Sequence, residues 1–90
     1  MRNEHFDVTV TVGGERQGEP QVVADTVQAA ALLLEHWPAE RRGPKYRAAL
    51  RACMDVMEQR KGVASARKAF IAAAREARLF VRQGGSNSKH

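Results

Sequence analysis

The stretch FDVTVTV, residues 6–12, alternates apolar and polar side chains without a break. Successive side chains of a β-strand point to opposite faces, so this alternation predicts a half-buried strand. Its apolar face would consist of Phe6, Val8, Val10 and Val12. An isolated hairpin is barely stable in water, so this strand needs a partner strand and a cover of helices over its apolar face.

The residues that follow predict the partner strand. Gly13, Gly14 and Gly18 favour a turn, and residues 21–24 (QVVA) are typical of a short returning strand. Pro20 stands at the start of that strand, where its missing N–H does least harm. The chain is therefore expected to begin with a β-hairpin.

A helix over residues 26–37 is expected next. Asp25 and Gln28 have the spacing of a capping box, and Pro38 ends the pattern. Apolar residues at helical spacing predict its buried stripe; they are Val27, Ala30, Ala31, Leu34 and Trp37. Leu32 falls outside this stripe, and we interpret it as a candidate apolar interface residue.

Two more helices are expected. Pro44 is a favoured first position for a helix over 44–60, with Gly62 as its C-terminal stop. Ser65 is the expected cap of a helix over 66–79. The buried stripe of the first would be Tyr46, Ala49, Leu50, Cys53, Val56 and Met57, and that of the second Ala66, Ala69, Phe70, Ala73 and Ala77. Residues 79–81 either prolong the last helix or form a short edge strand.

Together these patterns predict an α+β fold, in which an N-terminal β-hairpin is followed by three α-helices packed on one face (order ββααα). A short C-terminal edge strand is the open alternative at 79–81. We expect one small domain over residues 1–81, since a chain of 90 residues supports a single modest core. Residues 82–90 (RQGGSNSKH) are Gly/Ser-rich, and we expect them to form a disordered tail.

Nothing in the sequence indicates catalysis, a metal or a cofactor. Cys53 lies in the middle of an apolar stripe, where a thiol is usually an inert core residue. The three histidines have no metal-ligand spacing. No apolar run exceeds six residues and no signal peptide is recognisable, so we expect a cytoplasmic protein that does not enter a membrane.

The charges divide unevenly along the chain. Residues 1–40 hold two basic and seven acidic side chains, a net charge of −5, whereas residues 41–90 hold thirteen basic and three acidic ones, a net charge of +10. Within the octet 40–47 (ERRGPKYR) the cations crowd a helix start, which already carries partial positive charge. Candidate anion or partner contacts are Arg41, Arg42 and Lys45 in the octet, and Arg67, Lys68, Arg75, Arg78 and Arg82, which share one arc if the last helix reaches residue 82.

Three interpretations of the octet are open. Acidic groups of the same chain neutralise its cations, acidic groups of another subunit do so, or Arg41, Arg42 and Lys45 hold a phosphate or carboxylate at the helix start. We favour compensation within or between subunits, because the two halves have opposite sign. The cations of the last helix either form a solvated basic face, which is the favoured interpretation, or bind an acidic protein surface or the phosphates of nucleic acid. The sequence thus predicts a non-enzymatic interaction or regulatory module that binds a protein or a second copy of itself. Nucleic-acid binding is the alternative.

Several separated motifs also match a known family. They are Trp37-Pro38, Gly43-Pro44 with Tyr46, the alanine-rich residues 48–53 and the run 66–77. In this order they resemble domain of unknown function 982, a family of short proteins. The resemblance covers about residues 6–81 and implies no catalytic or binding residues.

Overall fold

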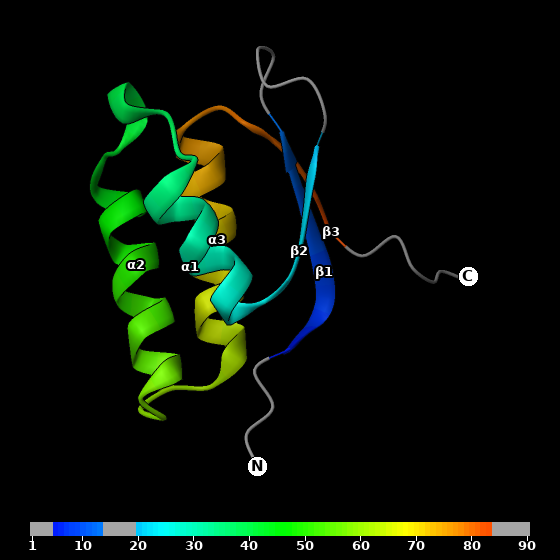
Figure 1. The fold of residues 1–90 in the computed structure, drawn as a ribbon, viewed down its shortest axis with the longest axis vertical. Helices are drawn as coiled ribbons and strands as arrows, with labels where there is room; N and C mark the ends of the chain where they lie inside the picture. The colour runs from blue at the N-terminus through cyan, green and yellow to red at the C-terminus, as the bar shows by residue number, and fades with distance from the viewer. Residues whose placement is uncertain (1–4, 14–19, 84–90) are drawn as a thin grey trace, which may run out of the picture.

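The computed structural model describes residues 5–13 and 20–83. In chain order the elements are β1 (His5–Gly13), β2 (Gln21–Asp25), α1 (Thr26–Glu35), the 3-10 helix η1 (Ala39–Arg41), α2 (Pro44–Met57), α3 (Val63–Glu76) and β3 (Phe80–Gln83). Figure 1 shows the three α-helices on one side of the sheet. The α+β prediction, with a hairpin followed by three helices, is confirmed.

The sheet has the order β2-β1-β3, and β1 pairs antiparallel with both neighbours. Phe6, Val10 and Val12 are buried, as the alternation predicts, while the side chain of Val8 lies outside the described side chains. Val12 pairs with Gln21 on one side and with Val81 on the other. The turn expected at 14–19 also lies outside the described residues.

The edge-strand alternative for the C-terminal end is confirmed, since β3 begins at Phe80. The strand runs to Gln83, so Arg82 and Gln83 belong to the sheet and not to the tail that we expected from residue 82. The remainder of that tail, residues 84–90, lies outside the described residues.

The helices α2 and α3 pack through small side chains. Ala49 and Cys53 of α2 and Ala66, Ala73 and Ala74 of α3 are fully or almost fully buried. Both predicted inner stripes are confirmed, although Leu50, Met57 and Ala69 are only half-buried. Small side chains let the two helix backbones approach closely. Helix α1 packs against both of them, whereas β1 and β3 of the sheet contact α3.

Helix α1 is rotated relative to the prediction. Its buried residues are Thr26, Ala29 and Leu33, whereas Val27 is 56% exposed and Leu34 is 60% exposed. The predicted buried stripe is therefore wrong at Val27, Ala31 and Leu34. Its other two members follow the prediction, since Trp37 is buried just beyond the helix and Ala30 packs half-buried against the core. Leu32, expected to be the outward apolar residue, is half-buried and packs against the core.

The N-terminal cap of α1 follows the expected pairing. The backbone N–H of Gln28 donates to Asp25 Oδ1 at 2.8 Å, and the backbone N–H of Ala24 donates to Gln28 Oε1 at 2.7 Å. The first bond satisfies a backbone donor that the start of the helix leaves open, and the second ties the Gln28 side chain back to β2.

The later helix ends differ from the prediction. Helix α2 ends at Met57 and not at residue 60, and Gln59 in the left-handed region (φ 66°) follows its end in place of the stop expected at Gly62. Gly62 instead caps the start of α3, and Ser65 lies inside that helix. Helix α3 ends at Glu76, followed by Arg78 in the left-handed region (φ 63°).

Both helix ends use the same hydrogen-bond pattern. After α3, the N–H of Arg78 donates to the carbonyl of Arg75 at 3.0 Å, and the N–H of Leu79 donates to that of Ala74 at 2.9 Å. The corresponding bonds after α2 come from Gln59 and Arg60. This is a Schellman motif, which ends a helix even where the left-handed residue is not glycine.

Candidate partner-contact site

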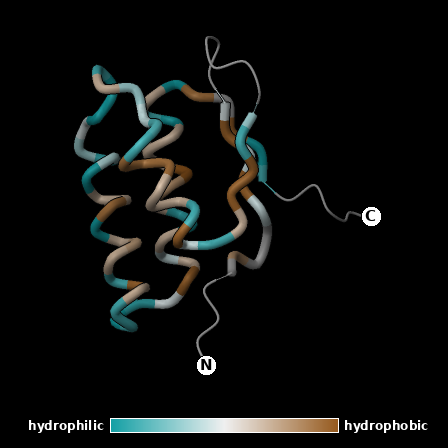
Figure 2. The backbone as a smooth tube through the Cα atoms, viewed as in Figure 1, coloured by the Kyte–Doolittle hydropathy of each residue, from teal (hydrophilic) through white to brown (hydrophobic). Residues whose placement is uncertain are grey.

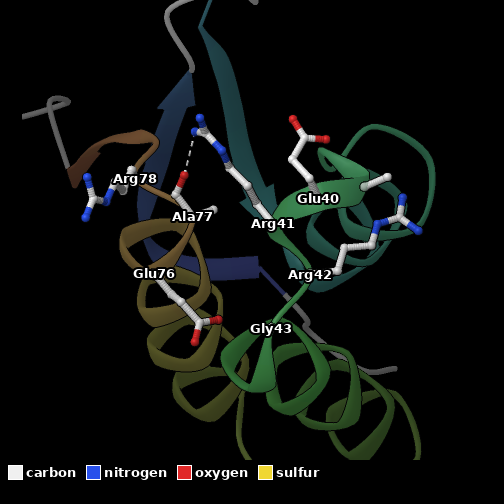
Figure 3. A pocket seen from close by; sticks show the side chains of 8 residues that line it. Glu40, Arg41, Arg42, Gly43, Glu76, Ala77 and Arg78 are labelled. Atoms are coloured by element: carbon white, nitrogen blue, oxygen red, sulfur yellow. Dashed lines mark hydrogen bonds between the residues drawn. The ribbon is translucent and has the colours of Figure 1, made fainter.

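The structure brings part of the basic octet to the end of α3. A hollow of about 590 Å³ lies between η1 and the C-terminus of α3 (Figure 3). Its charged lining residues are Glu40, Arg41, Arg42, Glu76 and Arg78. Three of the eight predicted cations, Arg41, Arg42 and Arg78, thus share one surface feature although more than thirty residues separate Arg78 from the other two.

Glu76 supplies the anion that the start of α2 requires. The backbone N–H of Lys45 donates to Glu76 Oε1 at 3.1 Å. Gly43 makes this approach feasible, because a Cβ there would lie 2.9 Å from Glu76 Oε1. Figure 3 shows the Glu76 side chain directed toward Gly43. The carboxylate therefore faces the positive end of the α2 dipole, where negative charge is stabilising.

Two of the three arginines of the octet, Arg41 and Arg42, are also held within the molecule. Arg41 Nη1 donates to the backbone carbonyl of Ala77 at 2.8 Å, the bond drawn in Figure 3. Arg42 Nη2 donates to the carbonyl of Trp37 at 3.1 Å, and its guanidinium lies 5.3 Å from the centre of the Tyr46 ring. The cation at Arg41 thus meets the negative end of α3.

The hollow is therefore a junction between two helix ends. A carboxylate meets the start of α2, and a guanidinium meets the end of α3. Arg42 and Arg78 point away from each other, on opposite sides of the hollow (Figure 3). The arginines do not converge on one point, as recognition of a phosphate or carboxylate ligand would require.

The basic arc expected on the last helix does not form one surface. It required a helix to residue 82, but α3 ends at Glu76. Arg67 is half-buried and donates from Nη1 to Gln83 Oε1 at 3.1 Å, Arg78 lies in the turn, and Arg82 lies in β3. Lys68 and Arg75 remain on an exposed face of α3, seven residues or about 10 Å apart along the helix axis.

A surface that the sequence did not predict lies on α1. We call Val27, Ala31 and Leu34 the outer face of α1; all three are exposed. They lie within about 60° of one another around the helix at 100° per residue. No charged residue occurs in α1 before Glu35, and hydrophobic colours run along much of this helix in Figure 2. The signal in the sequence was this all-apolar composition, since such a helix leaves one apolar side uncovered at a protein surface.

Helix α2 adds an apolar margin, which we call the α2 rim and define as Leu50 and Met54. Tyr46 faces α1, because its hydroxyl donates to the carbonyl of Leu33 at 2.8 Å. Around α2, Leu50 follows Tyr46 by about 40° and Met54 by about 80°. Leu50 is half-buried and Met54 is 52% exposed, so this side of α2 passes gradually from core to solvent.

The groups that carry catalytic chemistry elsewhere are placed differently here. Cys53 is fully buried, and burial raises the pKa of its thiol from 9.0 to about 11. The thiol is therefore protonated near neutral pH and is a poor nucleophile. Within residues 5–13 and 20–83 there is no group of three His, Cys, Asp or Glu side chains that could hold a metal ion. In the same residues no helix is long and apolar enough to cross a membrane.

Comparison with known proteins identifies the family of this chain. The model of DUF982, a family described as proteins of unknown function, matches residues 8–81. The chain belongs to the DUF982 family. No curated protein and no solved structure matches it. The description of DUF982 names no activity, so the surfaces of this DUF982 protein are what bears on its function.

Proposed function

We propose that this DUF982 protein is a non-enzymatic protein-interaction module and that the outer face of α1 is its docking surface. The observation that carries the proposal is the exposure of Val27 and Leu34, each more than half open to water on the same side of one helix. Burying a valine or leucine side chain fully is worth about 1.5–3 kcal/mol. A partner that covers both residues therefore gains several kcal/mol before the costs of association.

The charged residues support a docking surface on α1 and not at the hollow. Two of the four cations of the octet, Arg41 and Arg42, donate to the carbonyls of Ala77 and Trp37, and Glu76 accepts from the backbone of Lys45. A ligand there would have to compete with these bonds. The outer face of α1, by contrast, offers apolar area without the cost of removing charges from water.

Nucleic-acid binding, the alternative, has less support. It relied on five cations in one arc, assisted by Arg41, Arg42 and Lys45, and α3 ends before two of the five. Of the others, Arg67 is half-buried and already bonded to Gln83. Two exposed cations on one helix face are a weak basis for the phosphate contacts on which such binding depends.

A photo-crosslinking residue placed at Ala31 tests the proposal in cells that produce the full chain. Lys68 is the matched control position, because it is also exposed on a helix but lies outside the outer face of α1. We expect a discrete protein adduct from position 31, identified by mass spectrometry, which is absent from position 68 and is lost with Leu34→Ser. Equal labelling from both positions would overturn the proposal. An adduct with nucleic acid from position 68 alone would favour the alternative.

A further inference from the structure

We infer that the partner of the outer face of α1 is a second copy of this chain, bound through two antiparallel α1 helices related by a two-fold axis. The inference rests on the docking surface proposed above and names its occupant. Three properties of α1 support it: the spacing of its exposed apolar residues, the position of its charge, and the area that the surface can supply.

The spacing is self-complementary. Val27 and Leu34 lie at equal distances from the midpoint of α1, between Ala30 and Ala31. An antiparallel copy therefore places Val27 against Leu34 of the second copy, and by symmetry the reverse contact also forms. Ala30 and Ala31 fall at the axis, where small side chains let two helices pack at the short end of the usual 8–10 Å separation. On both copies, Val27 and Leu34 therefore flank the small side chains of Ala30 and Ala31.

The charge selects the antiparallel orientation. Glu35 is the one charged residue of α1 and is exposed at its C-terminal end. In antiparallel helices the Glu35 residues of the two copies are separated by nine residues, about 13 Å along the axis. This exceeds the Debye length of about 8 Å at physiological salt. Parallel helices would instead place the two carboxylates side by side at one end of the contact.

The available area predicts a weak, reversible dimer. A standard interface buries about 800 Å² per partner, roughly 14% of the 5847 Å² that this chain exposes. Helix α1 has ten residues and is about 15 Å long, so its outer face supplies only part of that area. The α2 rim supplies further apolar area, because Met54 is 52% exposed and Leu50 beside it is half-buried. We therefore expect dissociation in the micromolar range.

Analytical ultracentrifugation of the full chain from about 5 to 500 µM tests the inference. The variants are Leu34→Glu, in the outer face of α1, and Ala48→Glu, an exposed position on α2 that receives the same charge. We expect a concentration-dependent dimer whose dissociation constant rises at least tenfold with Leu34→Glu and changes less than twofold with Ala48→Glu. Circular dichroism checks that both variants keep their helices. A dimer that Leu34→Glu leaves unchanged would overturn the inference.

Disulfide trapping tests the orientation. Antiparallel packing predicts that oxidising a mixture of Val27→Cys and Leu34→Cys chains gives the mixed dimer, while either variant alone gives little dimer. Cys53 is fully buried and serves as an unreactive internal control. Dimers formed by Val27→Cys alone would indicate parallel helices and overturn the proposed geometry.

The two levels of the proposal fail in different ways. A chain that stays monomeric at all concentrations, but gives an adduct from position 31 with another protein, would exclude the second copy and keep the docking surface. A monomer that gives no adduct from position 31 would exclude both.

Discussion

The octet 40–47 and the outer face of α1 differ in opposite ways from what their residue types suggest. The octet carries four cations and looks like a binding site, yet two of them, Arg41 and Arg42, donate to backbone carbonyls of the same chain, and Glu76 faces the backbone of Lys45. The outer face of α1 looks like core, yet Val27 and Leu34 are exposed. Residue type alone therefore does not show which side chains are engaged within the molecule and which are exposed.

The difference shows what decides whether a surface is available to a partner. At the junction, each charge lies beside the helix end of opposite sign, so the two helix dipoles and the two side chains stabilise one another. Glu76 illustrates this well. In the last turn of α3 its charge is unfavourable for its own helix, but it lies against the start of α2. The apolar residues of the outer face of α1 have no such contact within the described fold.

The largest expected effect is the difference in the free energy of unfolding between substitutions of two neighbouring leucines of α1. Leu33 is fully buried and Leu34 is 60% exposed. Leu33→Ala should lower the free energy of unfolding by about 3 kcal/mol, because it leaves a cavity in the core. Leu34→Ala should change it by less than about 0.5 kcal/mol when the chain is monomeric. Urea denaturation at low micromolar concentration measures both values.

The pair of variants is its own control, since the side chains are identical and adjacent. If Leu34→Ala were the more destabilising variant, α1 would be rotated as the sequence pattern first indicated. The contrast between the outer face of α1 and the junction would then lose its basis.

The sequence predicted the kind and order of the elements because their signals are local. Strict alternation identified β1, Pro44 identified the start of α2, and Asp25 with Gln28 identified the start of α1. The rotation of α1 was not predictable in this way. With residues 29–34 all apolar, every side of the helix looks like an inner side. Its orientation is set by tertiary contacts such as the bond from Tyr46 to the carbonyl of Leu33.

Neutralisation of the octet by groups of the same molecule was one of the interpretations of the sequence. The anions expected for it lay in the acidic N-terminal half of the chain. The anion that caps α2 is Glu76, 31 residues from Lys45. No local pattern connects the two, because the contact depends on the antiparallel packing of α2 and α3. Gly43 was a hint, since a residue without Cβ permits a close approach by another group.

A smaller effect is expected at the junction itself. Glu76→Ala should lower the free energy of unfolding by about 1 kcal/mol, because the start of α2 loses a capping carboxylate. The loss should shrink in high salt, which screens the interaction with the helix dipole. Thermal or urea denaturation at 50 mM and 1 M NaCl measures the difference.

Glu40→Ala is the matched control for this prediction, because Glu40 lines the same hollow and is an exposed carboxylate. We expect it to change stability by less than about 0.3 kcal/mol, the range of an ordinary surface substitution. Equal losses from both variants would mean that the general charge of the hollow matters, and not the contact from Glu76 to α2.

The smallest expected effect tests whether the Arg78 side chain contributes to the stability of the hollow. Arg78 and Gln59 occupy equivalent left-handed positions after α3 and α2, where glycine has no steric cost. Arg78→Gly and Gln59→Gly should each raise the free energy of unfolding by about 0.5 kcal/mol, since relief of the left-handed conformation slightly exceeds the added flexibility of the unfolded chain.

Equal gains are expected if the hollow is only a junction, because Arg78 points away from its centre (Figure 3). A loss at Arg78 alongside a gain at Gln59 would show that the Arg78 side chain stabilises the hollow. The octet would then have to be reconsidered as part of a larger charged surface.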